Sequence, residues 1–106
     1  MEYSFVGKEN QSAAEKLLNG EMGKIIGFGQ SMTPILASGQ AVIVSPLKED
    51  TEINKKDIVF CKVKGHYYLH LVHAIKDGRY LIGNNHGHMN GWIGRKQIFG
   101  KVVEKL

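Results

Sequence analysis

The spacing of apolar residues along the chain predicts one helix followed by a series of strands. Residues 12–20, SAAEKLLNG, have a helical period, with Ser12 and Glu15 at capping-box spacing and Gly20 placed to end the helix. Beyond them the apolar residues come in short runs typical of strands. These runs are KIIGF (24–28), AVIVS (41–45), DIVFCKV (57–63), YYLHLVHAI (67–75), YLIGN (80–84) and IFGKVVEKL (98–106).

The segments between these runs predict where the chain turns. KGH (64–66) separates two runs as in a hairpin, and Asp77-Gly78 suits the type I′ turn of a second hairpin. Residues 46–56 are a polar link, and we expect residues 85–96, NHGHMNGWIGRK, to form an irregular loop. We therefore predict one mostly β domain of about six strands, with residues 1–24 as an N-terminal helical segment and residues 25–106 as the β-sheet.

Composition and charge indicate which classes of binding partner this chain is not suited to. The 106 residues are 42% hydrophobic and include 13 glycines but 2 prolines, as expected of one small core with many turns. The net charge of +4 comes without a block of basic residues, which argues against nucleic-acid binding. Without a signal peptide or an apolar run of about 18 residues, we expect a soluble, cytoplasmic protein with no membrane anchor in this chain.

Two features that can carry chemistry are interpreted as structural. Cys61 is the only cysteine, and its place in an apolar strand predicts a buried residue rather than a nucleophile. His86 and His88 could ligate zinc, but two histidines in a glycine-rich loop are a weak signal without further ligands. We therefore expect neither a metal nor another cofactor.

The segment GFGQSMTPILASGQAVIVSP (27–46) places Ser31 in a glycine-bracketed turn ahead of an apolar strand. A serine hydroxyl is a weak nucleophile, so it needs a base within hydrogen-bond reach and donors for the oxyanion. Gly29 lets a bound peptide approach the backbone closely, and the amides around Ser31 can supply the donors.

The base must come from another part of the chain, and the long predicted hairpin offers histidines and lysines. On YYLHLVHAI, His70 shares a strand face with Tyr68 and Val72, whereas His73 points to the other face. A histidine acts as a base without a large pKa shift, while a lysine would first have to be desolvated. These residues alone leave both kinds of base open.

Four sequence blocks occur in an order that matches a known family. They are G-x-S-M-x-P-x-L-x-x-G-x-x-V-x-V (29–44), KKDIV (55–59), YLIGNN (80–85) and IFGKVVEKL (98–106). Together they resemble the LexA-like and signal-peptidase-like serine proteases over residues 25–103. The resemblance implies a compact, partly closed β-sheet with Ser31 as the nucleophile.

The resemblance also implies the identity of the base. Most members use a Ser-Lys dyad, but the signal peptidases of archaea and the endoplasmic reticulum carry a histidine in an H-R-V context. The matching segment here is H-L-V, with His70 in the position of the base. Lys62 and Lys64 come too early in the chain and are interpreted as surface charges.

The remaining site residues follow from the same comparison. The histidine-type enzymes have an aspartate that orients the base, where this chain has Asn84 followed by Asn85. An amide accepts a hydrogen bond but cannot stabilise an imidazolium by charge, so these asparagines are candidates for orienting His70. The residues assigned to the oxyanion site or the substrate groove are Gly29, Gln30, Met32 and Pro34.

These features predict a small serine endopeptidase that cleaves an extended polypeptide with a Ser-His dyad. A phage- or plasmid-type processing role is one setting, and both self-cleavage and cleavage of a separate target are open. The alternative is a catalytically inactive member of the fold that binds a peptide or a partner protein as an extended strand. An asparagine at position 84 in place of the usual aspartate favours this alternative.

Overall fold

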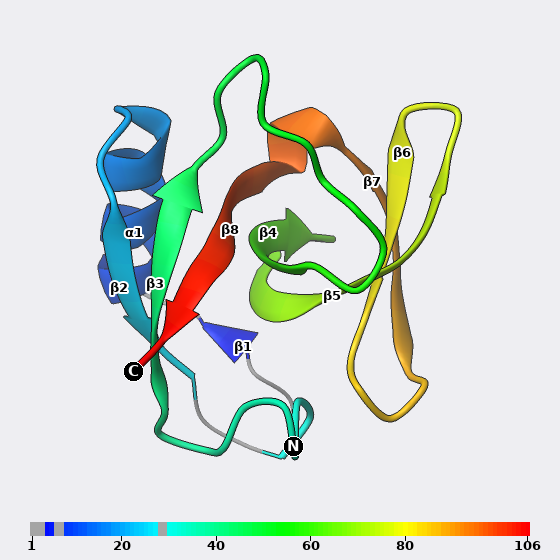
Figure 1. Ribbon diagram of the computed structural model, residues 1–106, viewed down its shortest axis with the longest axis horizontal. Helices are drawn as coiled ribbons and strands as arrows, with labels where there is room; N and C mark the ends of the chain where they lie inside the picture. The colour runs from blue at the N-terminus through cyan, green and yellow to red at the C-terminus, as the bar shows by residue number, and fades with distance from the viewer. Residues whose placement is uncertain (1–3, 6–7, 28–29) are drawn as a thin grey trace.

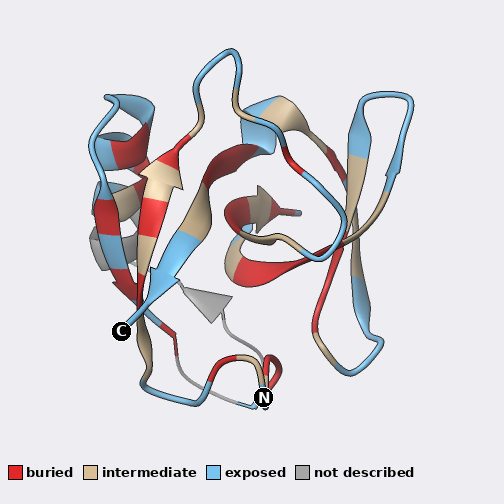
Figure 2. Ribbon diagram, in the orientation of Figure 1, coloured by how far each residue is buried: buried red, intermediate tan, exposed pale blue. Residues whose placement is uncertain are grey.

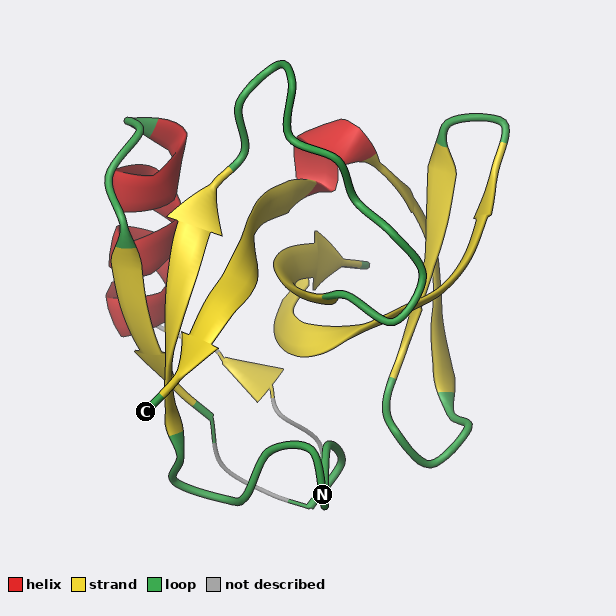
Figure 3. Ribbon diagram, in the orientation of Figure 1, coloured by secondary structure: helices red, strands yellow, loops and turns green. Residues whose placement is uncertain are grey.

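The computed structural model describes residues 4–5, 8–27 and 30–106, and strands are the commonest element among them (Figure 3). In chain order the elements are β1 (Ser4–Phe5), α1 (Lys8–Leu18), β2 (Gly23–Ile26), β3 (Ala41–Pro46), β4 (Ile58–Val63), β5 (His66–Lys76), β6 (Arg79–Gly83), β7 (Met89–Gly94), the 3₁₀ turn η1 (Arg95–Gln97) and β8 (Ile98–Lys105). The predicted mostly β fold is confirmed, and each of the six predicted runs contains a strand.

The strands form one curled antiparallel sheet. Along it the order is β2-β3-β8-β4-β5-β6-β7, and β1 pairs with β5. The last strand, β8, therefore lies between β3 and β4, in the middle of the sheet (Figure 1). Because the sheet curls, β4 and β5 cross the centre of the molecule, while β6 and β7 form an arm along one side.

Both predicted hairpins are present. β4 meets β5 through Lys64-Gly65, and β5 meets β6 through Asp77-Gly78. All four turn residues have positive φ, as a type I′ turn requires at both of its central positions. The two turns set the register of β5, the strand that carries His70.

The helix is longer than its sequence pattern indicated. α1 begins at Lys8 rather than at Ser12, which lies exposed within the helix, so the capping-box interpretation is wrong. The added first turn is entirely polar and therefore has no apolar period to reveal it. The predicted end is correct: Gly20 has φ +85°, and the Glu21 N–H donates to the Lys16 carbonyl at 2.9 Å. Within the described ranges, no helix is long and apolar enough to cross a membrane.

The prediction of an irregular loop over residues 85–96 is wrong. Only its first part is a loop, because β7 and η1 occupy the rest. Gly91 and Gly94 interrupt the alternation that would have indicated a strand in the sequence. The strand forms because β6 pairs with it in antiparallel from Met89 to Gly94, with one irregularity at Asn90.

The core has two parts, and the β4–β5 hairpin contributes residues to both. Figure 2 marks the buried positions in red. Alternate residues of β4 enter different parts, so that Phe60 packs with Tyr67 and Phe99 in the first part while Val59 and Cys61 belong to the second. The buried residues of the first part are Ala14, Leu17, Ile25, Met32, Leu36, Val42, Val44, Phe60, Leu69, Leu71 and Phe99. Those of the second are Ile53, Val59, Cys61, Val63, Val72, Ile82, Ile93 and Ile98.

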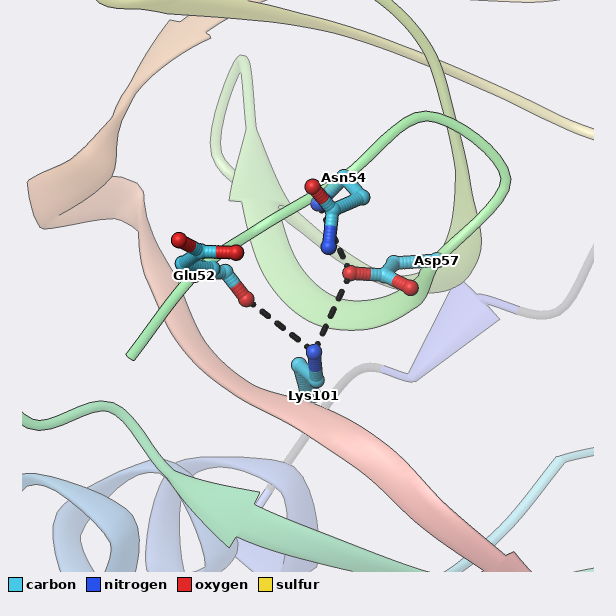
Figure 4. Close-up of polar contacts among 4 residues, drawn as sticks. All are labelled: Glu52, Asn54, Asp57 and Lys101. Carbon is cyan, nitrogen blue, oxygen red and sulfur yellow. Dashed lines mark hydrogen bonds and ion pairs between the residues drawn. The ribbon is translucent and has the colours of Figure 1, made fainter. Parts of the chain in front are cut away.

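The polar link between β3 and β4 is tied to β8 by Lys101 (Figure 4). Its Nζ donates to the Glu52 carbonyl at 3.0 Å and pairs with the Asp57 carboxylate at 3.3 Å. Asp57 also accepts the Asn54 N–H at 2.8 Å. The ion pair is partly exposed to solvent and contributes little by itself, so its effect is to hold the link against the sheet.

Candidate active site

Ser31 lies in a turn between β2 and β3 rather than at the end of a strand. Two neighbours, Met32 and Leu36, are fully buried in the first part of the core, and the Leu36 N–H donates to the Met32 carbonyl at 2.9 Å. These apolar anchors hold the turn against the core and leave the Ser31 side chain 3% exposed. The Met32 side chain therefore packs in the core and does not line a substrate groove, while its backbone N–H stays a candidate for the oxyanion site.

The other predicted groove residues lie at the surface or outside the described residues. Pro34 is exposed and follows a cis Thr33–Pro34 peptide bond. Gln30 is exposed as well, and its carbonyl accepts the Thr33 hydroxyl at 2.9 Å. Gly29 lies outside the residues that the structure describes. Gln30 and Pro34 thus flank Ser31 on the surface and stay candidates for substrate contact.

His70 reaches the site from the middle of β5. It pairs with Val59 across the β4–β5 ladder, and its ring is fully buried. The Tyr68 ring stacks on it, with centroids 4.9 Å apart and planes 29° from parallel, as expected of residues two apart on one strand face. The strand and the stacked ring together hold the imidazole in one orientation.

The structure brings Ser31 and His70 together although 39 residues separate them. The Ser31 Oγ lies 3.3 Å from the His70 Nε2. This distance is at the long end for a hydrogen bond, as is common for catalytic contacts in the absence of substrate. On the other edge of the ring, the His70 Nδ1 lies 2.7 Å from the Asn90 Oδ1. Serine, imidazole and amide therefore form one continuous chain of contacts.

Asn90 is a site residue that the sequence analysis missed. It lies on β7, within the segment expected to be an irregular loop. In the sequence, Asn90 is marked only as a polar residue shortly after the predicted strand 80–84. Other polar residues share this position, so the signal does not single it out. The orienting candidates Asn84 and Asn85 make different contacts.

Asn84 and Asn85 shape the loop after β6 instead of contacting His70 Nδ1. The Asn84 Oδ1 accepts the backbone N–H groups of His86 and His88 at 2.8 and 2.9 Å. The Asn84 carbonyl accepts the His73 Nε2–H at 2.7 Å, which ties β5 to the same loop. Because its side-chain oxygen already serves two backbone donors, Asn84 is a loop-forming residue.

This loop braces the turn that carries Ser31. The Asn85 N–H donates to the Ser31 carbonyl at 2.8 Å, and the Asn85 side-chain amide donates to the Thr33 carbonyl at 2.9 Å. His86 Nε2 donates to the Gln30 carbonyl at 2.9 Å. Three hydrogen bonds thus fix the serine turn against a segment more than 50 residues away in the chain.

We expect the Asn84→Ala variant to lose about 1–3 kcal/mol of unfolding free energy, because two backbone N–H groups lose their acceptor. Asn84→Asp keeps an acceptor oxygen and should recover most of this loss. Urea unfolding of the two variants and the wild type measures the difference. Equal destabilisation by both substitutions would contradict the assigned role.

His86 of the HGH segment contacts the turn that carries Ser31. His86 Nε2 contacts the Gln30 carbonyl and lies 3.2 Å from the Thr33 hydroxyl, so one ring nitrogen is already engaged. In the part of the chain that the structure describes, no group of three or more His, Cys, Asp or Glu side chains could hold a metal ion. The geometry therefore offers no described set of ligands for zinc.

Cys61 lies on β4 in the second part of the core, and its side chain is fully buried. Its Sγ lies 3.8 Å from the Tyr68 carbonyl. Burial raises the pKa of the Cys61 thiol far above its ordinary value, because the thiolate would lose its hydration. The thiolate is the reactive form of cysteine, so this residue is suited to packing and not to nucleophilic attack.

We expect Cys61 to be unreactive toward a thiol reagent such as DTNB in the folded protein and reactive in urea. Stability should also fall as pH rises above the ordinary thiol pKa of about 8.5, where only the unfolded chain releases this proton. Cys61→Ala lacks that contribution, so its stability should fall less steeply with pH than that of the wild type. Equal slopes, or rapid labelling of the folded protein, would contradict the prediction.

Comparison with protein families gives one match. A family model described as Peptidase S24-like matches residues 9–103 of the chain. The match includes the serine turn, the strand with His70 and the strand with Asn90. Comparisons with curated proteins and with solved structures give no match.

Proposed function

The chain belongs to the Peptidase S24-like family, and on that premise we propose that it is a serine endopeptidase with Ser31 as nucleophile and His70 as general base. The observation that carries the proposal is the 3.3 Å contact between Ser31 Oγ and His70 Nε2. A nucleophile within hydrogen-bond reach of a base that a third group orients is the usual arrangement for acyl transfer.

In the proposed reaction, His70 Nε2 takes the proton of Ser31 Oγ as this oxygen attacks the scissile carbonyl carbon. Backbone N–H groups near Ser31 stabilise the oxyanion of the tetrahedral intermediate. His70 then gives its proton to the leaving amine, the C–N bond breaks and an acyl-serine remains. Water then attacks the ester carbonyl carbon as His70 takes one of its protons. The bond between this carbon and Ser31 Oγ breaks, His70 returns the proton to Oγ, and the second product leaves as an acid.

Two properties of the site support this chemistry. The near-complete burial of both side chains shields their hydrogen bond from water and so strengthens it. The bracing loop keeps the Ser31 turn in place through backbone contacts, so the nucleophile needs little reorganisation before attack. The substrate in this proposal is a polypeptide in extended form, bound over the surface next to Gln30 and Pro34.

The test is to incubate the purified protein with a broad peptide library and to identify products by mass spectrometry. New termini that appear with the wild type and not with Ser31→Ala support an endopeptidase. If the protein cleaves its own chain, the fraction cleaved per unit time should be measured at several protein concentrations. A fraction that does not depend on concentration would identify intramolecular self-cleavage. Binding of a library peptide without cleavage by the wild type would instead favour the inactive, peptide-binding alternative.

A further inference from the structure

We propose that Asn90 is the positioning residue of this site, which holds His70 in the tautomer whose unprotonated Nε2 faces Ser31. The inference rests on the proposed function. Its basis is the 2.7 Å contact between Asn90 Oδ1 and His70 Nδ1, on the ring edge away from Ser31. Asn90 acts through His70 and has no role in bond making or breaking.

The tautomer follows from the chemistry of the amide. A side-chain amide oxygen accepts hydrogen bonds and cannot donate them, so the proton on this edge of the ring belongs to His70 Nδ1. In a neutral imidazole only one nitrogen carries a proton. His70 Nε2 therefore has its lone pair directed at the Ser31 hydroxyl, as a general base requires. The opposite tautomer would put a proton where the serine proton has to go.

A local irregularity in the sheet places Asn90 at the ring. Along the β6–β7 ladder, Ile82 pairs with Gly91 and Gly83 pairs with Met89. Asn90 is therefore the extra residue of a β-bulge, a feature that turns a side chain out of its regular direction and is common next to active sites. A regular ladder would have given Asn90 a partner on β6 and a direction set by strand alternation.

Two glycines make this bulge possible. Gly91 has φ +145°, a conformation that residues with a side chain rarely adopt. Gly83, on the partner strand, lies so close to the next loop that a Cβ would sit 2.6 Å from the His88 carbonyl oxygen. The two glycines thus let the backbone of β6 and the loop before β7 lie close together. This packing holds the Asn90 amide 2.7 Å from His70 Nδ1.

A neutral amide orients the ring but adds no charge to stabilise the imidazolium that forms during the reaction. A carboxylate at the same position would do both, so Asn90→Asp should favour the protonated ring. Besides Asn90, two side chains are placed against the ring by their contacts: Tyr68, which stacks on it, and the Ser31 hydroxyl. Tyr68 is the titratable member of this set and is unchanged in the Asn90 variants.

The experiment compares the wild type with Asn90→Ala, Asn90→Asp and the control Asn54→Ala, an exposed asparagine in the polar link. The first readout is the His70 tautomer in the free protein, from long-range ¹⁵N–¹H correlation spectra of the imidazole nitrogens. The second is peptide cleavage, with kcat and KM determined separately across pH.

We expect the wild type and Asn54→Ala to show the Nδ1–H tautomer and Asn90→Ala to show both tautomers. Asn90→Ala should lower kcat about 10- to 100-fold with little change in KM, because the contact matters most as the imidazolium forms. Asn90→Asp should restore the Nδ1–H tautomer and recover kcat. Because the carboxylate favours the protonated ring, the rise of kcat with pH should occur at higher pH than in the wild type.

Two results would overturn the inference: an Nε2–H tautomer in the wild type, or an unchanged tautomer in Asn90→Ala. A loss of stability in Asn90→Ala with unchanged kcat would also overturn it, since it would show a purely structural role. The tautomer is measured without substrate, so it decides the role of Asn90 even if no peptide is cleaved. Absence of cleavage by the wild type would count against the proposed function separately.

Discussion

Replacing Ser31 by alanine is expected to lower the rate of peptide cleavage by at least about 10³-fold while leaving the fold intact. The substitution removes the attacking oxygen, and loss of a nucleophile removes the covalent route entirely. Its effect on stability should stay near 1 kcal/mol, because one hydrogen bond to His70 is lost and no apolar group is removed. Product formation by mass spectrometry and thermal unfolding measure the two effects.

Ser12→Ala is the matched control for this variant. Ser12 is exposed on α1, so its substitution removes a hydroxyl outside the serine turn. It should cleave at the wild-type rate. Cleavage by Ser31→Ala at a comparable rate would rule out Ser31 as the nucleophile, and the site would have to be sought elsewhere in the family fold.

The second large effect is expected for His70→Ala, which should lower cleavage about as far as Ser31→Ala. Members of a catalytic dyad act as a unit, so the double variant should be no slower than either single variant. Cleavage by the wild type should rise with pH as the imidazole loses its proton, because only the neutral ring can accept the serine proton. Rates of the four proteins at several pH values measure both expectations.

Stability has to be measured alongside, because His70 is fully buried. His70→Ala leaves a cavity and removes the partner of the Asn90 amide, so it is expected to be less stable than the wild type. His70→Gln keeps most of the volume and a polar end, which separates loss of the base from loss of folding. His66→Ala, on the exposed start of the same strand, is the control and should cleave normally. A double variant much slower than both single variants would contradict the dyad.

The strands and turns of this protein were predictable because their signals are local. The six apolar runs each contain a strand, and the turn formed by Asp77 and Gly78 has the positive φ angles that its sequence indicated. The start of α1 and the whole of β7 were not predictable in the same way. The first turn of α1 is polar throughout, and the glycines of β7 remove the alternation on which a strand prediction depends.

For the site, the sequence by itself identified Ser31 and His70 as the candidate nucleophile and base. Ser31 stands in a glycine-bracketed turn, and His70 was indicated by the resemblance of its H-L-V segment to the H-R-V of the histidine-type signal peptidases. The burial of the Met32 side chain in the core could not be predicted in this way, because a methionine beside a nucleophile suits a groove and a core equally well.

Only the tertiary structure decided which residue meets the other edge of the His70 ring. Asn84 and Asn90 are both asparagines near the β6–β7 connection, and no local pattern distinguishes them. The choice depends on the register of the β6–β7 ladder and on the bulge at Asn90, which result from pairing between strands. It also depends on the backbone amides of the loop, which engage the Asn84 oxygen. A one-residue change of register reverses the direction of a side chain, so the third member of the site is a property of the assembled sheet and not of any segment of the chain.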